Sequence, residues 1–135
     1  MKEVVKLMDY RPDIKIVDAT LRDGGLVNNF RFTDEFVKDL YQTNIKAGVD
    51  VMEFGYKADK EMFDVKDFGK WKFCDDEDIR AVVGDNNTDL KIAVMADVGR
   101  CNYKQDIKPR AESPVDVIRV ATYICLLYTS DAADD

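Results

Sequence analysis

Two charged side chains, Arg22 and Asp23, follow the first expected strand of the chain and lead into Gly24 and Gly25. A carboxylate such as that of Asp23 is a hard oxygen ligand for Mg²⁺ or Mn²⁺. A guanidinium can hold a carboxylate or a developing enolate beside it. The pair therefore suits a reaction in which negative charge develops on an oxygen atom. An acid after a strand is also a common turn former or helix cap. Two interpretations of Asp23 therefore stay open, a metal ligand and a turn or capping residue.

Charged residues also lie in or at the ends of later expected strands. Glu53 interrupts the apolar segment 49–55, Asp97 ends the segment 91–97, and Arg119 lies inside 115–121. A charge inside an apolar strand needs a partner or a function, and an ion pair with Arg22 would satisfy Glu53 equally well. In βα barrels, the residues that carry chemistry gather at the carboxyl ends of the strands.

The sequence contains no histidine. This removes the commonest general base, the commonest metal ligand and every Ser/His or Cys/His nucleophile pair. Cys74, Cys101 and Cys125 are far apart and form no CxxC pair, so we expect buried free thiols rather than a disulfide framework or a zinc site. Catalysis would have to rest on carboxylates, Arg, Lys, Tyr or Cys.

The charge balance excludes two classes of partner. The 20 basic and 27 acidic side chains leave a net charge of −7, whereas nucleic acids and anionic membranes attract clustered Lys and Arg. No apolar stretch approaches the roughly 20 residues that span a bilayer, and the charged start does not resemble a signal peptide. We expect a cytoplasmic protein that binds neither nucleic acid nor membrane.

The elements that must position these side chains alternate between strand and helix. The strands are expected at 14–18, 49–55, 91–97 and 115–121, and the helices at 34–47, between Thr33 and Gly48, and at 75–83. A turn is expected at Gly24 and Gly25, a packed loop around Trp71, a solvated Lys57, and only a short or irregular helix between Gly99 and Pro114. Such units form parallel sheets with right-handed crossovers, so the fold class is α/β.

The segment DATLRDGG at residues 18–25, the capped helix after it and the motifs AGVD and VMEFG at residues 47–55 resemble the DRE-TIM metallolyase superfamily. This superfamily includes hydroxymethylglutaryl-CoA lyase-like and 4-hydroxy-2-oxovalerate aldolase-like proteins with a pyruvate carboxyltransferase-type domain, and the isopropylmalate and homocitrate synthases. The resemblance implies a TIM (β/α)₈ barrel. A complete barrel takes about 250 residues, so the chain is expected to be a fragment that holds the N-terminal half, about four βα units.

The chain is expected to divide into three parts. Residues 1–13 are a polar lead-in, residues 14–122 are the partial aldolase-type barrel, and residues 123–135 are a tail. From Cys125 onward the tail resembles translated sequencing adapter, which suggests that it is not native, although a genuine apolar segment with an acidic end is the alternative.

The resemblance also implies roles for individual residues. Arg22 would stabilise an enolate, Asp23 would bind the divalent metal ion, Mg²⁺ or Mn²⁺, and Glu53 would be the acid of the family motif. Two features depart from the family pattern: no histidine follows the metal-binding aspartate, and no His-x-His pair completes the metal site. The fragment by itself is therefore expected to be inactive.

The substrate implied by the resemblance is a small 2-oxo acid or a related carbonyl compound. The residues expected to contact it are Arg22, Asn28, Asn29, Asp97 and Arg119, with turn or capping roles equally open for the two asparagines. The expected reaction makes or breaks a carbon–carbon bond next to a carbonyl through an enolate, as in an aldolase or lyase. One alternative is a Claisen-type acyl-CoA condensing synthase, which Gly24 and Gly25 disfavour because synthases usually show Gly-Glu-Gln there. Another is a non-catalytic half-barrel that binds or assembles as a homodimer.

Overall fold

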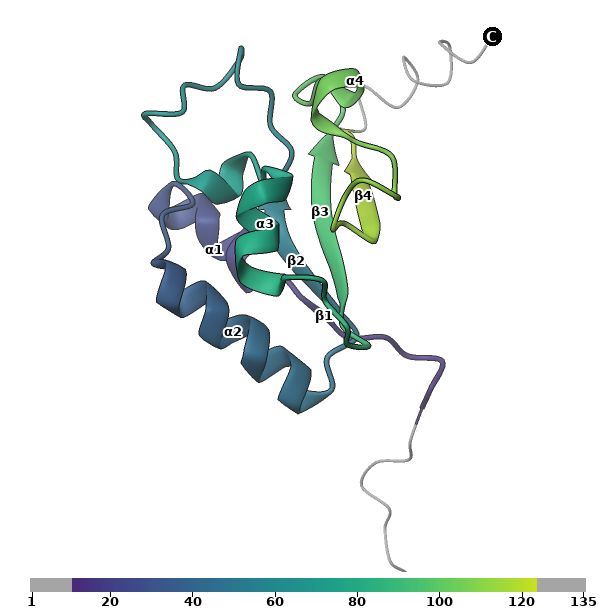
Figure 1. Ribbon diagram of the computed structural model, residues 1–135. Coiled ribbons are helices and arrows are strands. Elements are labelled where there is room, and N and C mark those ends of the chain that lie inside the picture. Colours follow the sequence, from purple (N-terminus) through teal and green to yellow (C-terminus); the bar gives the residue numbers. More distant parts are fainter. Residues whose placement is uncertain (1–10, 124–135) are drawn as a thin grey trace, which may run out of the picture.

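The computed structural model describes residues 11–123 as one parallel sheet with helices packed on it. The sheet has four strands in the order β1-β2-β3-β4, and every neighbouring pair is parallel. The strands are β1 (Val17–Asp18), β2 (Val51–Tyr56), β3 (Lys91–Asp97) and β4 (Val117–Ala121). The helices are α1 (Thr20–Asn28), α2 (Asp34–Ala47), η1 (Lys70–Lys72), α3 (Asp76–Val83) and α4 (Tyr103–Asp106). The α/β class expected from the sequence is confirmed (Figure 1).

Helix α2 begins and ends where its sequence predicts. The hydroxyl of Thr33 accepts a hydrogen bond from the backbone N–H of Phe36 at 3.2 Å, and Gly48 ends the helix with a φ of 73°. A positive φ is accessible to glycine without a steric cost, which explains the stop. Val37 and Tyr41 are buried on the inner face of the helix.

The hydrophobic core lies between the sheet and these helices. Successive strand residues point to opposite faces, and the helix-facing positions of the two central strands are fully buried: Met52, Phe54, Ile92 and Val94. Trp71 and Cys74, from the long segment after β2, join the same core. The packed loop expected around Trp71 is therefore confirmed.

Residues expected to form the first turn belong instead to α1. The segment that contains Gly24 and Gly25 is helical, and β1 is shorter than the strand expected at 14–18. Gly25 is required by packing rather than by a turn, because a Cβ there would lie 2.0 Å from Cδ1 of Phe30. The prediction of a turn at these glycines was therefore wrong. The contact between Gly25 and the Phe30 ring depends on the tertiary structure, and the local pattern of residue types does not reveal it.

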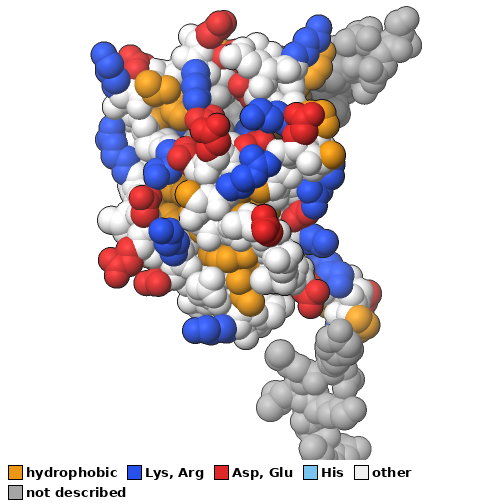
Figure 2. Space-filling view, viewed as in Figure 1, with side chains coloured by type: hydrophobic (Ala, Val, Ile, Leu, Met, Phe, Trp, Pro, Cys, Tyr) orange, Lys and Arg blue, Asp and Glu red, His pale blue; other side chains and the backbone are white. Residues whose placement is uncertain are grey.

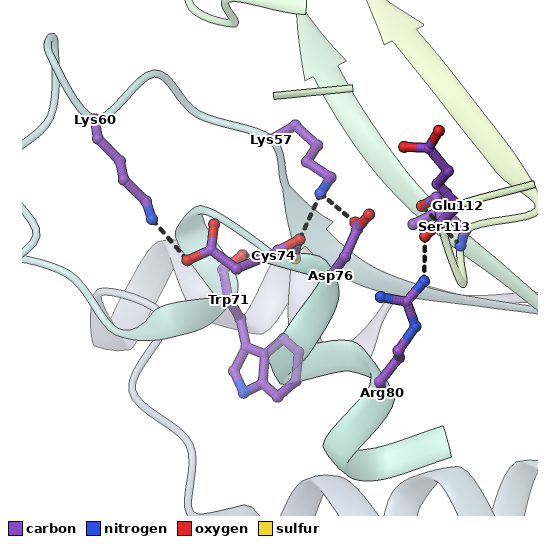
Figure 3. A network of polar contacts seen from close by, with 10 residues as sticks. Lys57, Lys60, Trp71, Cys74, Asp76, Arg80, Glu112 and Ser113 are labelled. Carbon is purple, nitrogen blue, oxygen red and sulfur yellow. Dashed lines mark hydrogen bonds and ion pairs between the residues drawn. The ribbon is translucent and has the colours of Figure 1, made fainter. Parts of the chain in front are cut away.

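The prediction that Lys57 is a solvated charge was also wrong. Its side chain is buried and donates hydrogen bonds to Asp76 at 2.8 Å and to the backbone oxygen of Cys74 at 2.7 Å (Figure 3). Asp76 opens α3, so the ion pair ties the end of β2 to the start of that helix. Only the tertiary structure brings the two charges together, because 19 residues separate them.

The outer surface and the edges of the sheet differ from the core. Acidic and basic side chains are interspersed over the face shown in Figure 2. On β4, the helix-facing Ile118 and Val120 are 38% and 71% exposed. None of the helices between residues 11 and 123 is both long enough and apolar enough to cross a membrane. Residues 124–135 of the tail, including Cys125, and residues 1–10 of the lead-in lie outside the described residues.

Candidate active site

The candidate site is built around Glu53, whose side chain is completely buried in the middle of β2. Its Oε1 atom accepts a hydrogen bond from Nε of Arg22 at 2.9 Å and another from Nη1 of Arg119 at 3.1 Å. Nη1 of Arg119 also lies 3.1 Å from Oε2. One carboxylate thus holds two guanidinium groups that come from α1 and β4.

The strand register explains how Arg119 reaches Glu53. Glu53 is paired with Ala93, and Arg119 is paired with Met95, two residues farther along β3. Residues two apart on a strand share a face, so Glu53 and Arg119 lie on the same side of the sheet. That side is opposite the helices, because Met52 lies on the other face of β2 and packs in the core beneath them.

Arg22 is contributed by the first turns of α1, directly after β1. Its Nη1 atom lies 2.6 Å from Oδ1 of Asp23, so the guanidinium lies between an exposed and a buried carboxylate. Partial burial lowers the pKa of Arg22, but the hydroxyl of Tyr56 and the carboxylates of Glu53 and Asp23 raise it above its usual value. The side chain therefore carries a permanent positive charge.

Glu53 retains one unused acceptor. Within the part of the chain that the structure describes, its buried Oε2 atom accepts no hydrogen bond. Buried polar atoms are almost always satisfied, and the exceptions mark strain, function or a missing partner. Oε2 therefore has only the ion-pair contact with Arg119 at 3.1 Å, and it keeps the capacity to accept a hydrogen bond.

The described residues do not build a metal site. Between residues 11 and 123, no three Cys, Asp or Glu side chains are placed to hold an ion together. Asp23, the residue expected to bind the metal, is 62% exposed and pairs with Arg22. Glu53 is occupied by two cations. A lone exposed carboxylate does not match the six or more oxygen ligands of Mg²⁺ or Ca²⁺ sites.

Not all of the expected substrate contacts gather at this cluster. Asn28 is at the far end of α1, about 9 Å along the helix axis from Arg22, and its side chain donates to the backbone oxygen of Arg31 at 2.8 Å. Asn29 ends the helix in a left-handed conformation, and its backbone oxygen accepts a hydrogen bond from Gly69 at 2.8 Å. Both asparagines have the turn and capping roles that were the alternative for them.

Asp97 ends β3 and lines a small hollow instead of touching Glu53. Its neighbours there include Tyr56, Lys72 and Arg100. Tyr56 is the last residue of β2, and its hydroxyl also influences Arg22. The hollow and the glutamate cluster are therefore adjacent on the edge where the strands end.

Sequence reasoning did not identify Lys72 as a site residue. Its ammonium lies 4.3 to 5.3 Å from the centroids of four aromatic rings, those of Phe30, Tyr56, Phe63 and Phe68. These rings come from separate segments of the chain, so their convergence is a product of the fold. The only local signal was the aromatic and lysine-rich character of residues 68–73.

Comparison with known proteins relates the chain to aldolases. It is 31% identical over 115 residues to 4-hydroxy-2-oxovalerate aldolase 6 of Rhodococcus jostii and 29% identical over 114 residues to 4-hydroxy-2-oxovalerate aldolase of Pelotomaculum thermopropionicum. The alignments cover 85% and 84% of this chain but 32% of each relative, so the chain spans about a third of the length of these curated relatives. No protein-family profile matches the chain, and no solved structure matches it significantly.

Proposed function

We propose that the chain is part of an aldolase-type lyase of the DRE-TIM superfamily and contains the first four βα units of its barrel. The observation that carries the proposal is the buried Glu53 with Arg22 and Arg119 on it. Support also comes from the similarity to two 4-hydroxy-2-oxovalerate aldolases over about 85% of this chain. The four parallel strands in sequential order support this proposal, because they match the number and order expected for half of an eight-stranded barrel.

In this proposal Arg22 binds the oxygen on which negative charge develops. When the C4 hydroxyl of a 4-hydroxy-2-oxo acid gives its proton to a base, the C3–C4 bond breaks, and an aldehyde and the enolate of the shorter 2-oxo acid are formed. A fixed guanidinium stabilises the enolate oxygen without having to reorganise. Glu53 is the positioning residue, because its buried carboxylate orients Arg22, and Arg119 provides a second cation for the substrate carboxylate.

Asp23 is proposed as a metal ligand only in a complete enzyme. An ion bound there would act as a Lewis acid on the substrate carbonyl. Among the described residues no three Cys, Asp or Glu side chains are placed to hold an ion together, so the remaining ligands would have to come from outside them. We also propose that three further residues contact the substrate, namely Asn28, Asn29 and Asp97. This contact requires the C-terminal end of α1 and the hollow lined by Asp97 to rearrange around the substrate.

The anion-binding role is tested by titrating the chain with oxalate, a planar analogue of the enolate of pyruvate. Calorimetry or NMR should detect binding, and Arg22→Gln should weaken it by at least about tenfold, corresponding to about 1.4 kcal/mol. The matched control is Arg11→Gln, because Arg11 is exposed and pairs with Asp13. Equal affinity of the Arg22 variant and the wild type would refute the assignment.

A second candidate function is assembly into a homodimer. It is favoured by the exposed Ile118 and Val120 on β4 and by the exposed Ile16 and Val17 beside the opposite edge. Unpaired strand edges with apolar side chains are templates for pairing. Analytical ultracentrifugation tests this function: a monomer at about 100 μM, well above the dissociation constant of a stable dimer, would exclude it.

A further inference from the structure

Tyr56 is the last residue of β2, and an irregularity in this strand decides to which side of the sheet it points. Glu53 pairs with Ala93 and Tyr56 pairs with Met95, so three steps along β2 match two steps along β3. This offset is a β-bulge, which reverses the side of the sheet on which the next side chain lies. Tyr56 therefore lies on the same side of the sheet as Glu53, opposite the helices.

Close packing around Gly55 fixes the course of the backbone just before Tyr56. A Cβ at Gly55 would lie 1.9 Å from the backbone oxygen of Trp71, so only glycine lets β2 and η1 approach each other in this way. Lys57, the next residue, is turned to the side of the helices, where it pairs with Asp76 at the start of α3. Successive strand residues alternate in direction, so the place of Lys57 agrees with that of Tyr56.

The ring of Tyr56 is held by two neighbours. Phe30 meets it edge to face, with the ring centroids 5.6 Å apart and an angle of 88° between the ring planes. The ammonium of Lys72 lies 5.0 Å from the Tyr56 centroid. The side chain as a whole is half-buried. These contacts restrict the ring, so its hydroxyl is held in one place at the end of β2.

The hydroxyl of Tyr56 is in hydrogen-bond contact with the guanidinium of Arg22. A guanidinium has N–H donors and no acceptor, so the phenol oxygen accepts in this contact and its own hydrogen remains available to a further acceptor. Nε and Nη1 of Arg22 already face Glu53 and Asp23. An anion that binds Arg22 therefore finds a second donor beside the guanidinium.

We propose that Tyr56 is a further catalytic residue, whose phenol donates a hydrogen bond to the oxygen of the 2-oxo acid that becomes the enolate oxygen beside Arg22. A neutral donor and a cation then stabilise the developing charge from two directions, and tyrosine hydroxyls serve as such donors in oxyanion holes. Tyr56 keeps its hydrogen throughout, so no proton transfer is involved. This inference rests on the proposed function for the substrate class and for the role of Arg22.

Calorimetric titration of the folded chain with oxalate tests the hydroxyl, because oxalate has an oxygen at the position of the enolate oxygen. Tyr56→Phe removes the hydroxyl and keeps the ring, and it should weaken oxalate binding about tenfold, corresponding to about 1.4 kcal/mol. The matched control is Tyr103→Phe, since Tyr103 is 66% exposed, and this variant should bind oxalate as the wild type does. Equal affinities of the two variants would overturn the proposal.

A second measurement separates a direct contact with the ligand from an effect that passes through Arg22. Replacing Tyr56 with 3-fluorotyrosine makes the hydroxyl more acidic, and therefore a stronger donor and a weaker acceptor. If the hydroxyl donates to oxalate, the affinity for oxalate should rise. If Tyr56 only accepts a hydrogen bond from Arg22, the affinity should stay the same or fall, and the proposal would be refuted.

The role of Tyr56 and the proposed function can fail separately. If Arg22→Gln weakens oxalate binding and Tyr56→Phe does not, the proposed function stands and the role of Tyr56 is refuted. If Tyr56→Phe weakens binding and Arg22→Gln binds oxalate as the wild type does, the Tyr56 hydroxyl stands as an anion contact and the role of Arg22 is refuted.

Discussion

Nε of Arg22 lies 2.9 Å from Oε1 of Glu53, and this contact joins the first helix of the chain to the second strand across 31 residues. Glu53 is fully buried, while 18% of the Arg22 side chain is exposed. The carboxylate is thus the anchor and the guanidinium is the group that can still meet a ligand. These two exposures support the proposal that Glu53 positions Arg22 and that Arg22 binds the ligand.

Removing the charge of Glu53 should affect both stability and binding. Glu53→Gln is expected to lower the free energy of unfolding by about 2 kcal/mol, because hydrogen bonds to charged groups contribute about 1.5 to 3 kcal/mol. Oxalate affinity should fall as well, since Arg22 loses its fixed orientation. Urea denaturation and calorimetry measure the two effects. The control is Glu61→Gln on the exposed loop after β2. If this variant lost as much stability as Glu53→Gln, the special role of the buried Glu53 carboxylate would be contradicted.

The buried ion pair of Lys57 and Asp76 should matter more than its exposed neighbour. Lys57→Met removes one partner and leaves Asp76 buried with a charge, so we expect a loss of about 3 to 5 kcal/mol. Lys60→Met breaks the pair with Asp75, whose two side chains are 48% and 49% exposed, and exposed pairs contribute about 0 to 1 kcal/mol. Denaturant unfolding of both variants tests the prediction, which fails if their stabilities are equal.

The two adjacent glycines of α1 should respond in opposite directions to alanine. Gly25→Ala places a Cβ 2.0 Å from Phe30, and such overpacking costs about 1 to 3 kcal/mol. Gly24→Ala meets Phe32 at 3.5 Å, an ordinary contact, and should stabilise by up to about 1 kcal/mol because alanine favours helix. Thermal unfolding of the two variants measures both effects. A melting temperature of Gly25→Ala equal to that of the wild type would contradict the assignment of α1.

Thiol labelling should separate the cysteines of the described region. Burial and the nearby Asp106 raise the pKa of Cys101 to about 11, and burial raises the pKa of Cys74 further. The thiolate is the reactive form, so labelling of Cys101 should increase about tenfold for each pH unit up to pH 10, without a plateau. Cys74 should react more slowly at every pH. Iodoacetamide kinetics in a Cys125→Ser background measure both rates, and a plateau near pH 9 would contradict the raised pKa.

Local patterns predicted the elements whose residues carry their own signals. Thr33 and Gly48 define α2, and the apolar segment 91–97 corresponds to β3. The alternation of strands and helices predicted the parallel α/β arrangement. Glu53 was expected to need a partner, because it is a charge inside an apolar strand, and it pairs with Arg22 and Arg119.

The contacts between distant segments were decided by the fold alone. The aromatic enclosure of Lys72, the burial of Lys57 against Asp76 and the close approach of Phe30 to Gly25 each join residues whose proximity depends on how strands and helices pack. The sequence by itself determined which residue types were present and which short segments would become strands or helices, because these preferences depend on near neighbours. Only the tertiary structure decided which charges became partners, since burial and pairing depend on segments that meet across the sheet.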